Sequence, residues 1–205
     1  MIDFKEETDM AFETVKKNLE ERGFRVSEFA TAAEAAEYLN GAIDGVSVGF
    51  GGSLTLKEMG LYEKLSEHNN VIWHWVNGLE TRGEAANTDV YITSVNGLAE
   101  DGQLINIDGA GNRVASTLFG HKKVYFVIGK NKLAPTYDEA LWRARNIAAP
   151  KNAQRLGKKT PCAVNGDRCY DCKSPDRICR GLVVHWGPMM GMEMEVVLVD
   201  ENLGL

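Results

Sequence analysis

Four cysteines lie close together in the last quarter of the sequence and are the residues best suited to chemistry. They are Cys162, Cys169, Cys172 and Cys179, in the spacing C-x6-C-x2-C-x6-C. The central pair can chelate one ion, and the outer two are near enough in sequence to complete a tetrahedral set of thiolates. Such sets bind Zn²⁺ or iron–sulfur clusters, and the spacing does not choose between them. Four free thiols, or a C-x-x-C redox pair with two bystanders, are the alternatives.

A glycine-rich turn stands between a predicted strand and a predicted helix. Gly51-Gly52-Ser53 follows the apolar run 45–50, and Thr55 lies near the start of the helical segment. Glycines let a backbone approach a ligand closely, and free amides at a helix start favour phosphate or carboxylate. The turn has neither the P-loop ending nor the dinucleotide-binding spacing. It predicts an anion site of unspecified kind, with a tight turn capped by Thr55 as the alternative.

A second polar segment, Asp108-Gly109-Ala110-Gly111-Asn112-Arg113, follows another predicted strand. Asp108 can act as a base or orient a hydroxyl group. Arg113 can hold an anion through the two parallel donors of its guanidinium. A simple hairpin exit, in which Asn112 caps a helix, is the alternative.

Two more polar groups are expected at the same rim of the sheet. Asn96 follows one predicted strand, and Asn131-Lys132 follows the next. Open α/β sheets bind ligands outside the carboxyl ends of their strands, so Lys132 can meet an anionic ligand there, or else lie in solvent. The predicted ligand-binding residues are Gly51, Gly52, Ser53, Thr55, Asn96, Gly109, Gly111, Asn112, Asn131 and Lys132, and the candidate catalytic residues are Asp108 and Arg113.

Alternating strands and helices would position these segments. Apolar runs predict strands at 24–29, 45–50, 71–75, 89–94, 123–128, 182–186 and 194–200. The pattern indicates an α/β fold with a mainly parallel sheet and helices on both faces. The segment 103–107 is expected to pair with an extension of 89–94 as a mixed edge hairpin. Residues 160–180 form a cysteine-rich loop within a single domain, 1–205.

Helix ends are marked by capping residues and by proline. The motif T-x-x-E predicts a capping box at Thr31 with Glu34, Thr55 with Glu58, and Thr136 with Glu139. The helix after Thr136 is expected to end near Pro150, because proline disrupts a helix interior.

Composition restricts the class of function. The chain has 205 residues and a net charge of −6, so nucleic-acid binding through a basic surface is not expected. No apolar run approaches the roughly 20 residues that cross a bilayer. The charged start has no apolar signal core, which predicts a cytoplasmic location. Clustered cysteines in a cytosolic chain favour metal or redox chemistry over structural disulfides.

Several of these segments, taken together, resemble the LUD-domain (lactate-utilisation) family. The resemblance extends from about Asp3 to Leu203, and its most specific parts are the Asp-Gly-x-Gly-Asn-Arg-Val run and the cysteine tail. The segments that carry it are 50–53, 93–97, 102–109, 111–115, 129–132 and 162–179.

The resemblance implies a fold similar to that of ribose-5-phosphate isomerase and the CoA transferases. In that fold the glycine turn, here 51–55, holds phosphate-bearing ligands. Asp108-Gly109-Ala110 is similar to the isomerase turn that carries a catalytic carboxylate, but Gly111 stands where a second acidic residue would be. This departure argues against isomerase chemistry. Better-known relatives form one component of a multi-subunit, iron–sulfur-dependent system that oxidises lactate to pyruvate.

We therefore expect a component of a lactate or related organic-acid oxidation system. It would bind a small anion and carry a metal or iron–sulfur centre, with the family context favouring iron–sulfur over zinc. Partner subunits with iron–sulfur or oxidoreductase function are expected, and a homo-oligomer remains open. The alternatives are a stand-alone enzyme acting on a phosphorylated or CoA-linked molecule, and a non-catalytic regulatory module with structural zinc.

Overall fold

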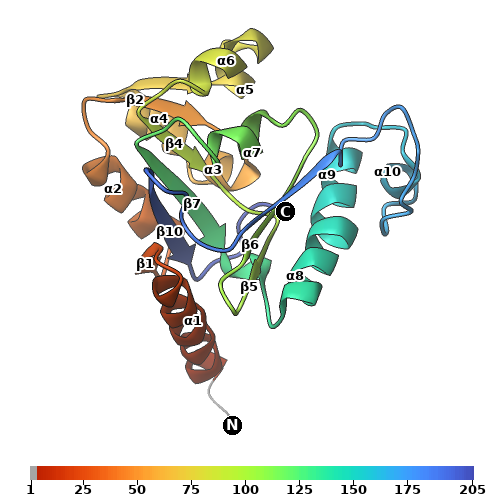
Figure 1. Ribbon diagram of the computed structural model, residues 1–205, viewed down its shortest axis with the longest axis horizontal. Coiled ribbons are helices and arrows are strands. Elements are labelled where there is room, and N and C mark those ends of the chain that lie inside the picture. The colour runs from red at the N-terminus through yellow and green to blue at the C-terminus, as the bar shows by residue number, and fades with distance from the viewer. Residues whose placement is uncertain (1–3) are drawn as a thin grey trace.

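The structure is a computed structural model that describes residues 4–205, with side chains described from residue 12 onward. Its main element is a six-stranded, fully parallel sheet (Figure 1). Buried runs of β-branched and aromatic residues form the central strands, as expected for a sheet covered on both faces. In spatial order the strands are β1 (Arg25–Phe29), β10 (Glu193–Val199), β7 (Lys123–Gly129), β4 (Val90–Thr93), β2 (Ser47–Phe50) and β3 (Asn70–Trp73).

A smaller, mixed sheet of four strands lies against the first. Its order is β8 (Leu133–Ala134), β5 (Gly97–Ala99), β6 (Leu104–Asp108) and β9 (Gly181–His185). The predicted hairpin is present, since β5 pairs antiparallel with β6. It forms part of this separate sheet and not an edge of the parallel one. Asn96 lies where the chain passes from the parallel sheet to the second sheet. Its N–H donates to the carbonyl of Ile105, and its side-chain oxygen accepts from the N–H of Ile107.

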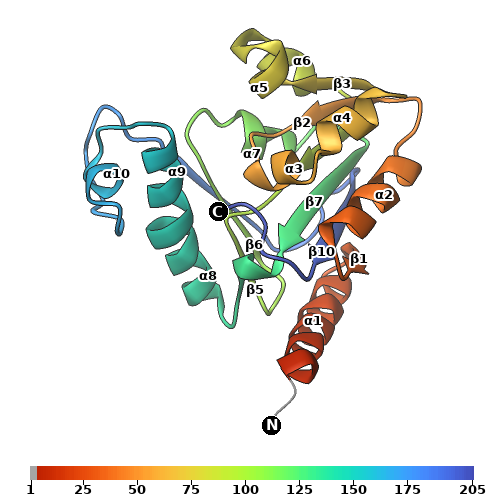
Figure 2. The same ribbon diagram turned by 180° about the vertical axis from the view of Figure 1, so that it is seen from behind.

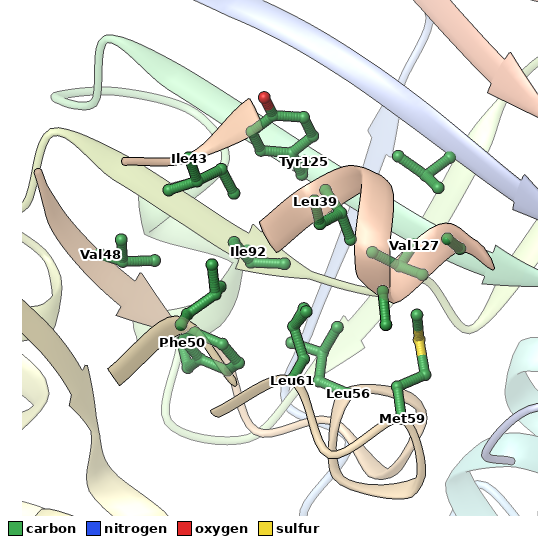
Figure 3. Packing of buried hydrophobic residues seen from close by; sticks show 14 of the residues in the cluster. Leu39, Ile43, Val48, Phe50, Leu56, Met59, Leu61, Ile92, Tyr125 and Val127 are labelled. Atoms are coloured by element: carbon green, nitrogen blue, oxygen red, sulfur yellow. The ribbon is translucent and has the colours of Figure 1, made fainter. Parts of the chain in front are cut away.

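Three helices cover one face of the parallel sheet. They are α2 (Ala32–Ala42), α3 (Leu54–Glu58) and α4 (Leu61–Ser66). Leu39, Leu56 and Leu61 are fully buried there, and Figure 3 shows them meeting Phe50 and Val127 of the sheet. This apolar layer holds α3, and with it the glycine turn, at the end of β2.

The other face is covered by α1 (Phe4–Glu21) and by the second sheet. Val15 and Leu19 of α1 are buried with Phe126 of β7, and Leu98 and Leu104 of the second sheet belong to the same cluster. The outer side of the second sheet packs on α8 (Tyr137–Arg143) through alanines 99, 134, 140 and 144. The predicted fold class is thus confirmed, with a sheet in place of some of the expected helices on one face.

Short helices lie near the carboxyl edge of the parallel sheet. They include α5 (His74–Asn77), a 3-10 turn (Leu79–Thr81), α6 (Arg82–Ala85), α7 (Asn112–Ser116) and α9 (Ala149–Arg155), and α10 (Pro161–Asn165) lies farther out. Figures 1 and 2 show α10 and the cysteine loop beside α9, on the side away from the parallel sheet. Among the described helices, none is both long enough and apolar enough to cross a membrane.

Two of the three predicted helix starts are confirmed. Thr31 and Glu34 form a complete capping box, and the Thr136 side chain accepts from the N–H of Glu139. The prediction for Thr55 is wrong: the cap of α3 is Ser53, which accepts from the N–H of Leu56. Thr55 is free to use its hydroxyl elsewhere.

Two predicted boundaries are also wrong. The strand predicted to reach residue 75 ends at Trp73, and α5 begins at His74. Pro150 does not end its helix, because a π-helical segment (Ala144–Ala148) precedes it and Pro150 sits in the first turn of α9. A first-turn residue needs no N–H partner within the helix, so proline is tolerated there.

Candidate functional site

A cleft of about 980 Å³ opens where the parallel strands end. The segments after β2, β3, β4 and β7 all contribute to its walls, so the chain places its polar turns at one rim. The cleft unites segments that are far apart in the sequence, as expected for a ligand site in an α/β sheet. Of the residues predicted for the site, those that line it are Gly52, Ser53, Thr55, Asn96, Asp108, Gly109, Asn112, Arg113 and Lys132.

Three of the predicted ligand-binding residues do not line the cleft but shape the backbone beside it. A Cβ on Gly51 would lie 2.6 Å from Thr93 Oγ1, so glycine permits two strands to pack closely here. Gly111 precedes α7 with a φ of 85°, a conformation that favours glycine. Asn131 accepts a 3.0 Å hydrogen bond from the N–H of Leu203 and so holds the C-terminal segment in place.

The guanidinium of Arg113 forms its hydrogen bonds with other groups of the protein. Its guanidinium donates to the carbonyls of Ser94 and Ile107, at 3.0 and 2.8 Å, and its Nε lies 3.6 Å from Asp108 Oδ2. It also donates to the side-chain oxygens of Asn96 and Asn106. Burial lowers the pKa of Arg113, while Asp108 opposes that shift. Arg113 therefore organises the cleft wall and does not offer the free fork expected from the sequence.

Asp108 has one satisfied oxygen and one open oxygen. Oδ1 accepts from the N–H groups of Ala110 and Gly111, at 3.1 and 2.9 Å. Oδ2 is buried and has no hydrogen-bond partner among the described residues. Its nearest cation, Arg113 Nε at 3.6 Å, is beyond hydrogen-bond distance, so Oδ2 can accept a hydrogen bond from a ligand.

Two further unpartnered groups line the cleft. His74 Nδ1 and Arg82 Nε are buried and, within the described part of the chain, have no hydrogen-bond partner. The pKa of His74 is lowered by burial and by Arg82, and Asp108 opposes that shift, so the three groups share one electrostatic environment. The sequence did not indicate either residue, because the strand was expected to continue through His74.

Lys132 lies at the bottom of the cleft. Its side chain is 3% exposed, and Nζ donates to Thr55 Oγ1 and Ser94 Oγ at 2.7 Å each. Burial, assisted by the charges of Arg143 and Arg113, lowers the pKa of Lys132 to about 7. Sequence reasoning placed Lys132 at the rim, but not in a buried pocket of hydroxyls.

Arg143 is a buried residue that the sequence did not single out. It lies on the α8 helix and is only 8% exposed. It donates to the carbonyls of Asn131 and Asn96, at 2.7 and 2.6 Å. Arg143 thereby fixes the backbone at the residue before Lys132 and at the second residue after Ser94.

The charge of the cleft is opposite to that of the chain. Acidic residues outnumber basic ones in the sequence by 29 to 23. The acidic side chains that line the cleft are Asp108 and Asp176, whereas the basic ones are Lys57, Arg82, Arg113, Lys132, Arg155, Lys158, Arg177 and Arg180. A concave, basic surface concentrates anions from solution.

The four cysteines come together around a second, small cavity of about 20 Å³. All four are free thiols of intermediate exposure. Cys169 Sγ accepts from the N–H of Asp171, at 3.3 Å, and from Arg145, at 3.9 Å. No three His, Cys, Asp or Glu side chains in the described part of the chain are positioned to hold one metal ion. The loop thus gathers the thiols without closing them into a finished metal site.

The small cavity and the cleft share a wall. Arg177, Ile178 and Cys179 line both. A Cβ on Gly109 would lie 2.6 Å from the carbonyl oxygen of Ile178, so the two loops touch backbone to backbone. The cysteine loop is therefore in direct contact with the turn that carries Asp108.

The fold and the cleft define an α/β protein with a basic cleft at the carboxyl edge of a parallel sheet. The sequence pattern of the LUD domain matches residues 12–199, and the chain belongs to this family, which is named for lactate utilisation. A similar structure is the crystal structure of a DUF162 family protein from Deinococcus radiodurans, with a TM-score of 0.58 and 14% identity over 94% of this chain and 98% of that one. At that identity the likeness concerns the fold alone. No curated protein matches the chain.

Proposed function

We propose that the chain binds a small organic anion, of the 2-hydroxy or 2-oxo acid class, as a component of a lactate or related organic-acid utilisation system. One observation carries the proposal. Three buried polar atoms on the cleft wall, His74 Nδ1, Arg82 Nε and Asp108 Oδ2, have no hydrogen-bond partner among the described residues. A ligand that supplies both a donor and acceptors would satisfy them.

A 2-hydroxy acid has that combination of groups. Its carboxylate suits Arg82 and the surrounding cations, because guanidinium and carboxylate form strong charge-assisted bonds. Its hydroxyl group can donate to Asp108 Oδ2, which lies in the same electrostatic environment. In this arrangement Asp108 would orient the hydroxyl group and could accept its proton.

Ligand-induced thermal stabilisation tests the proposal, because a ligand that binds only the folded state raises the melting temperature. We expect stabilisation by lactate or pyruvate in the wild type. Asp108→Asn should lose the response to lactate, and Arg82→Met the response to both acids. Asp200→Asn and Arg25→Met are matched controls whose ion pairs involve residues outside the cleft lining. An unchanged response in Asp108→Asn and Arg82→Met would contradict the proposed binding mode.

The size of the cleft favours a second candidate class of ligand. A volume of about 980 Å³ is at the upper end of the range for drug-sized ligands and far exceeds a three-carbon acid. Sugar phosphates and CoA thioesters therefore belong in the same thermal panel. Stabilisation by these alone would favour a stand-alone enzyme acting on a phosphorylated or CoA-linked molecule.

We also propose that Cys162, Cys169, Cys172 and Cys179 hold one metal centre, an iron–sulfur cluster in preference to zinc. The donor set supports this: four free thiols line one cavity, and Arg145 and Arg177 line it with them. The arrangement must tighten on loading, since the thiols do not yet form a metal site. An iron–sulfur cluster would supply one-electron transfer, while zinc would supply only structure.

Metal and sulfide analysis of protein purified without oxygen tests this part. We expect stoichiometric iron and acid-labile sulfide, with broad visible absorbance that bleaches on reduction. Stoichiometric zinc in a colourless protein would remove the electron-transfer role and favour a regulatory module. Protein free of any metal would overturn the shared centre.

A further inference from the structure

The surroundings of Lys132 are unusual for a lysine that only carries charge. Its amine is buried against two neutral hydroxyls, and no carboxylate among the described residues hydrogen-bonds to it. Burial and the charges of Arg143 and Arg113 disfavour a positive charge at this position, and together they outweigh the opposing carboxylate of Glu58. Buried cations are normally paired with anions, so this environment suits the neutral amine.

The hydrogen bonds around the amine also match its neutral form. A neutral amine has two N–H donors and one lone pair, whereas an ammonium has three donors and no lone pair. Thr55 directs its own hydroxyl proton to the carbonyl of Leu203 at 3.3 Å, so its oxygen can accept from Lys132. Ser94 provides the second oxygen. These two bonds leave the lone pair unused, and Lys132 lines the cleft.

A neutral amine in a basic cleft is suited to one kind of substrate. The cations attract a carboxylate, and a nucleophilic amine requires an electrophilic carbon beside it. We propose that Lys132 is a nucleophile that forms an imine with the carbonyl carbon of a 2-oxo acid held in the cleft. This inference rests on the proposed anion binding and extends it to a covalent step.

The step balances without an oxidant or reductant. The nitrogen lone pair attacks the carbonyl carbon, a C–N bond forms, and the oxygen takes a proton from nitrogen to give a carbinolamine. The C–O bond then breaks, and the oxygen leaves as water with the second nitrogen proton. Ser94, whose hydroxyl contacts the amine, is placed to relay these protons.

Borohydride trapping tests the inference, with pyruvate as the probe. Reduction of the imine leaves a stable secondary amine, so the peptide that contains Lys132 should gain the mass of pyruvic acid less one oxygen atom. At pH 7 about half of Lys132 is neutral, given its pKa of about 7. An exposed lysine is neutral in roughly one molecule in 2,500 at that pH. Labelling should therefore be strongly selective, and lactate, which has no carbonyl group at C2, should give no adduct.

Lys130 is the matched control, since it lies two residues away and pairs with Asp200. Lys130→Met should retain the adduct and Lys132→Met should lose it. Peptide mapping of the wild type assigns the site even where Lys132→Met does not fold.

The outcomes separate the inference from the proposed function. Stabilisation by pyruvate without an adduct on Lys132 would overturn the imine and leave anion binding intact. Neither stabilisation nor adduct would overturn both. Labelling spread evenly over the lysines would also reject the assignment.

Discussion

The backbone N–H of Arg180 donates a 2.8 Å hydrogen bond to the carbonyl oxygen of Asp108. The next residue, Gly181, pairs with Asp108 in the β6–β9 ladder. The end of the cysteine loop is thus the start of a strand that pairs with the strand carrying Asp108. Metal binding that orders the thiols would therefore also order the strand that carries Asp108. The proposed metal centre and the proposed anion site are for this reason expected to be coupled.

This coupling predicts that cysteine replacements weaken anion binding. A shared ion is lost when any ligand is removed, so Cys162→Ala and Cys179→Ala should lower the affinity for the stabilising acid by similar factors. We expect about tenfold, within the usual range of coupling energies. Isothermal titration calorimetry measures the affinity of each variant for the acid. Cys162 lines only the small cavity, so a loss confined to Cys179→Ala would point to a purely local wall effect.

The contact between the two loops predicts a specific cost for a methyl group. In Gly109→Ala the new Cβ would meet the backbone carbonyl of Ile178 at 2.6 Å, and neither backbone can move without disturbing the β6–β9 pairing. We expect destabilisation of about 1–3 kcal/mol, typical of overpacking. Gly181→Ala is the control, because a Cβ there has nothing within 4 Å. Urea denaturation compares the two, and equal midpoints would contradict the predicted steric conflict.

The parts of the fold that sequence reasoning predicted are those determined locally. The capping box of Thr31 depends on two residues that are three positions apart. The buried strands are recognised from apolar runs, which are visible in the local sequence without any long-range contact. The turns after β2, β4 and β7 could be assigned to one rim because parallel topology brings carboxyl ends together. For this reason the sequence predicted Lys132 at this rim, whereas Asp108, at the end of β6 in the second sheet, was predicted from its polar turn alone.

The parts that were missed depend on tertiary packing. Arg143 lies on a helix with an ordinary polar pattern, and it is buried only because α8 packs on the second sheet and faces the Asn96 carbonyl. His74 and Arg82 reach the cleft because the chain leaves β3 at Trp73 and folds into short helices. Neither the run 71–75 nor the spacing around Arg82 indicates that break. A single sequence carries no local pattern for contacts of this kind.

Because Arg113 donates its hydrogen bonds to acceptors within the protein, its replacement is predicted to lower the stability of the fold. Arg113→Lys retains the charge but cannot reach the carbonyls of Ser94 and Ile107 together with two asparagine oxygens, so buried acceptors lose their partners. We expect a loss of about 3–5 kcal/mol in the free energy of unfolding, as when a buried charge network is broken. Arg25→Lys, at an exposed ion pair with Glu193, should change it little. If Arg113→Lys is as stable as wild type but does not bind the acid, the result would instead favour direct binding of the anion by the Arg113 guanidinium.

The depressed pKa of Lys132 predicts how stability varies with pH. In the folded chain its pKa is about 7, against an ordinary value of 10.5, so between these limits the unfolded chain holds a proton that the folded chain does not. Stability then rises with pH across this window, by at most about 1.4 kcal/mol per unit for one proton. Below pH 7 both states are protonated, and this contribution to the slope disappears.

Lys132→Met removes the titrating group from both states, so its free energy of unfolding should lack that part of the slope. The variant carries no buried charge, so its free energy of unfolding should rise most relative to that of wild type at pH 7 and below. The loss of a hydrogen-bond partner by Thr55 and by Ser94 opposes this gain. Urea denaturation between pH 6 and about 9.5 measures this, since that range covers the lower limit of the window near pH 7 and most of the window itself. Lys130→Met, at a partly exposed ion pair, should keep the wild-type slope. Identical slopes for wild type and Lys132→Met would show that Lys132 titrates as an ordinary lysine, and would remove the basis for its nucleophilic role near neutral pH.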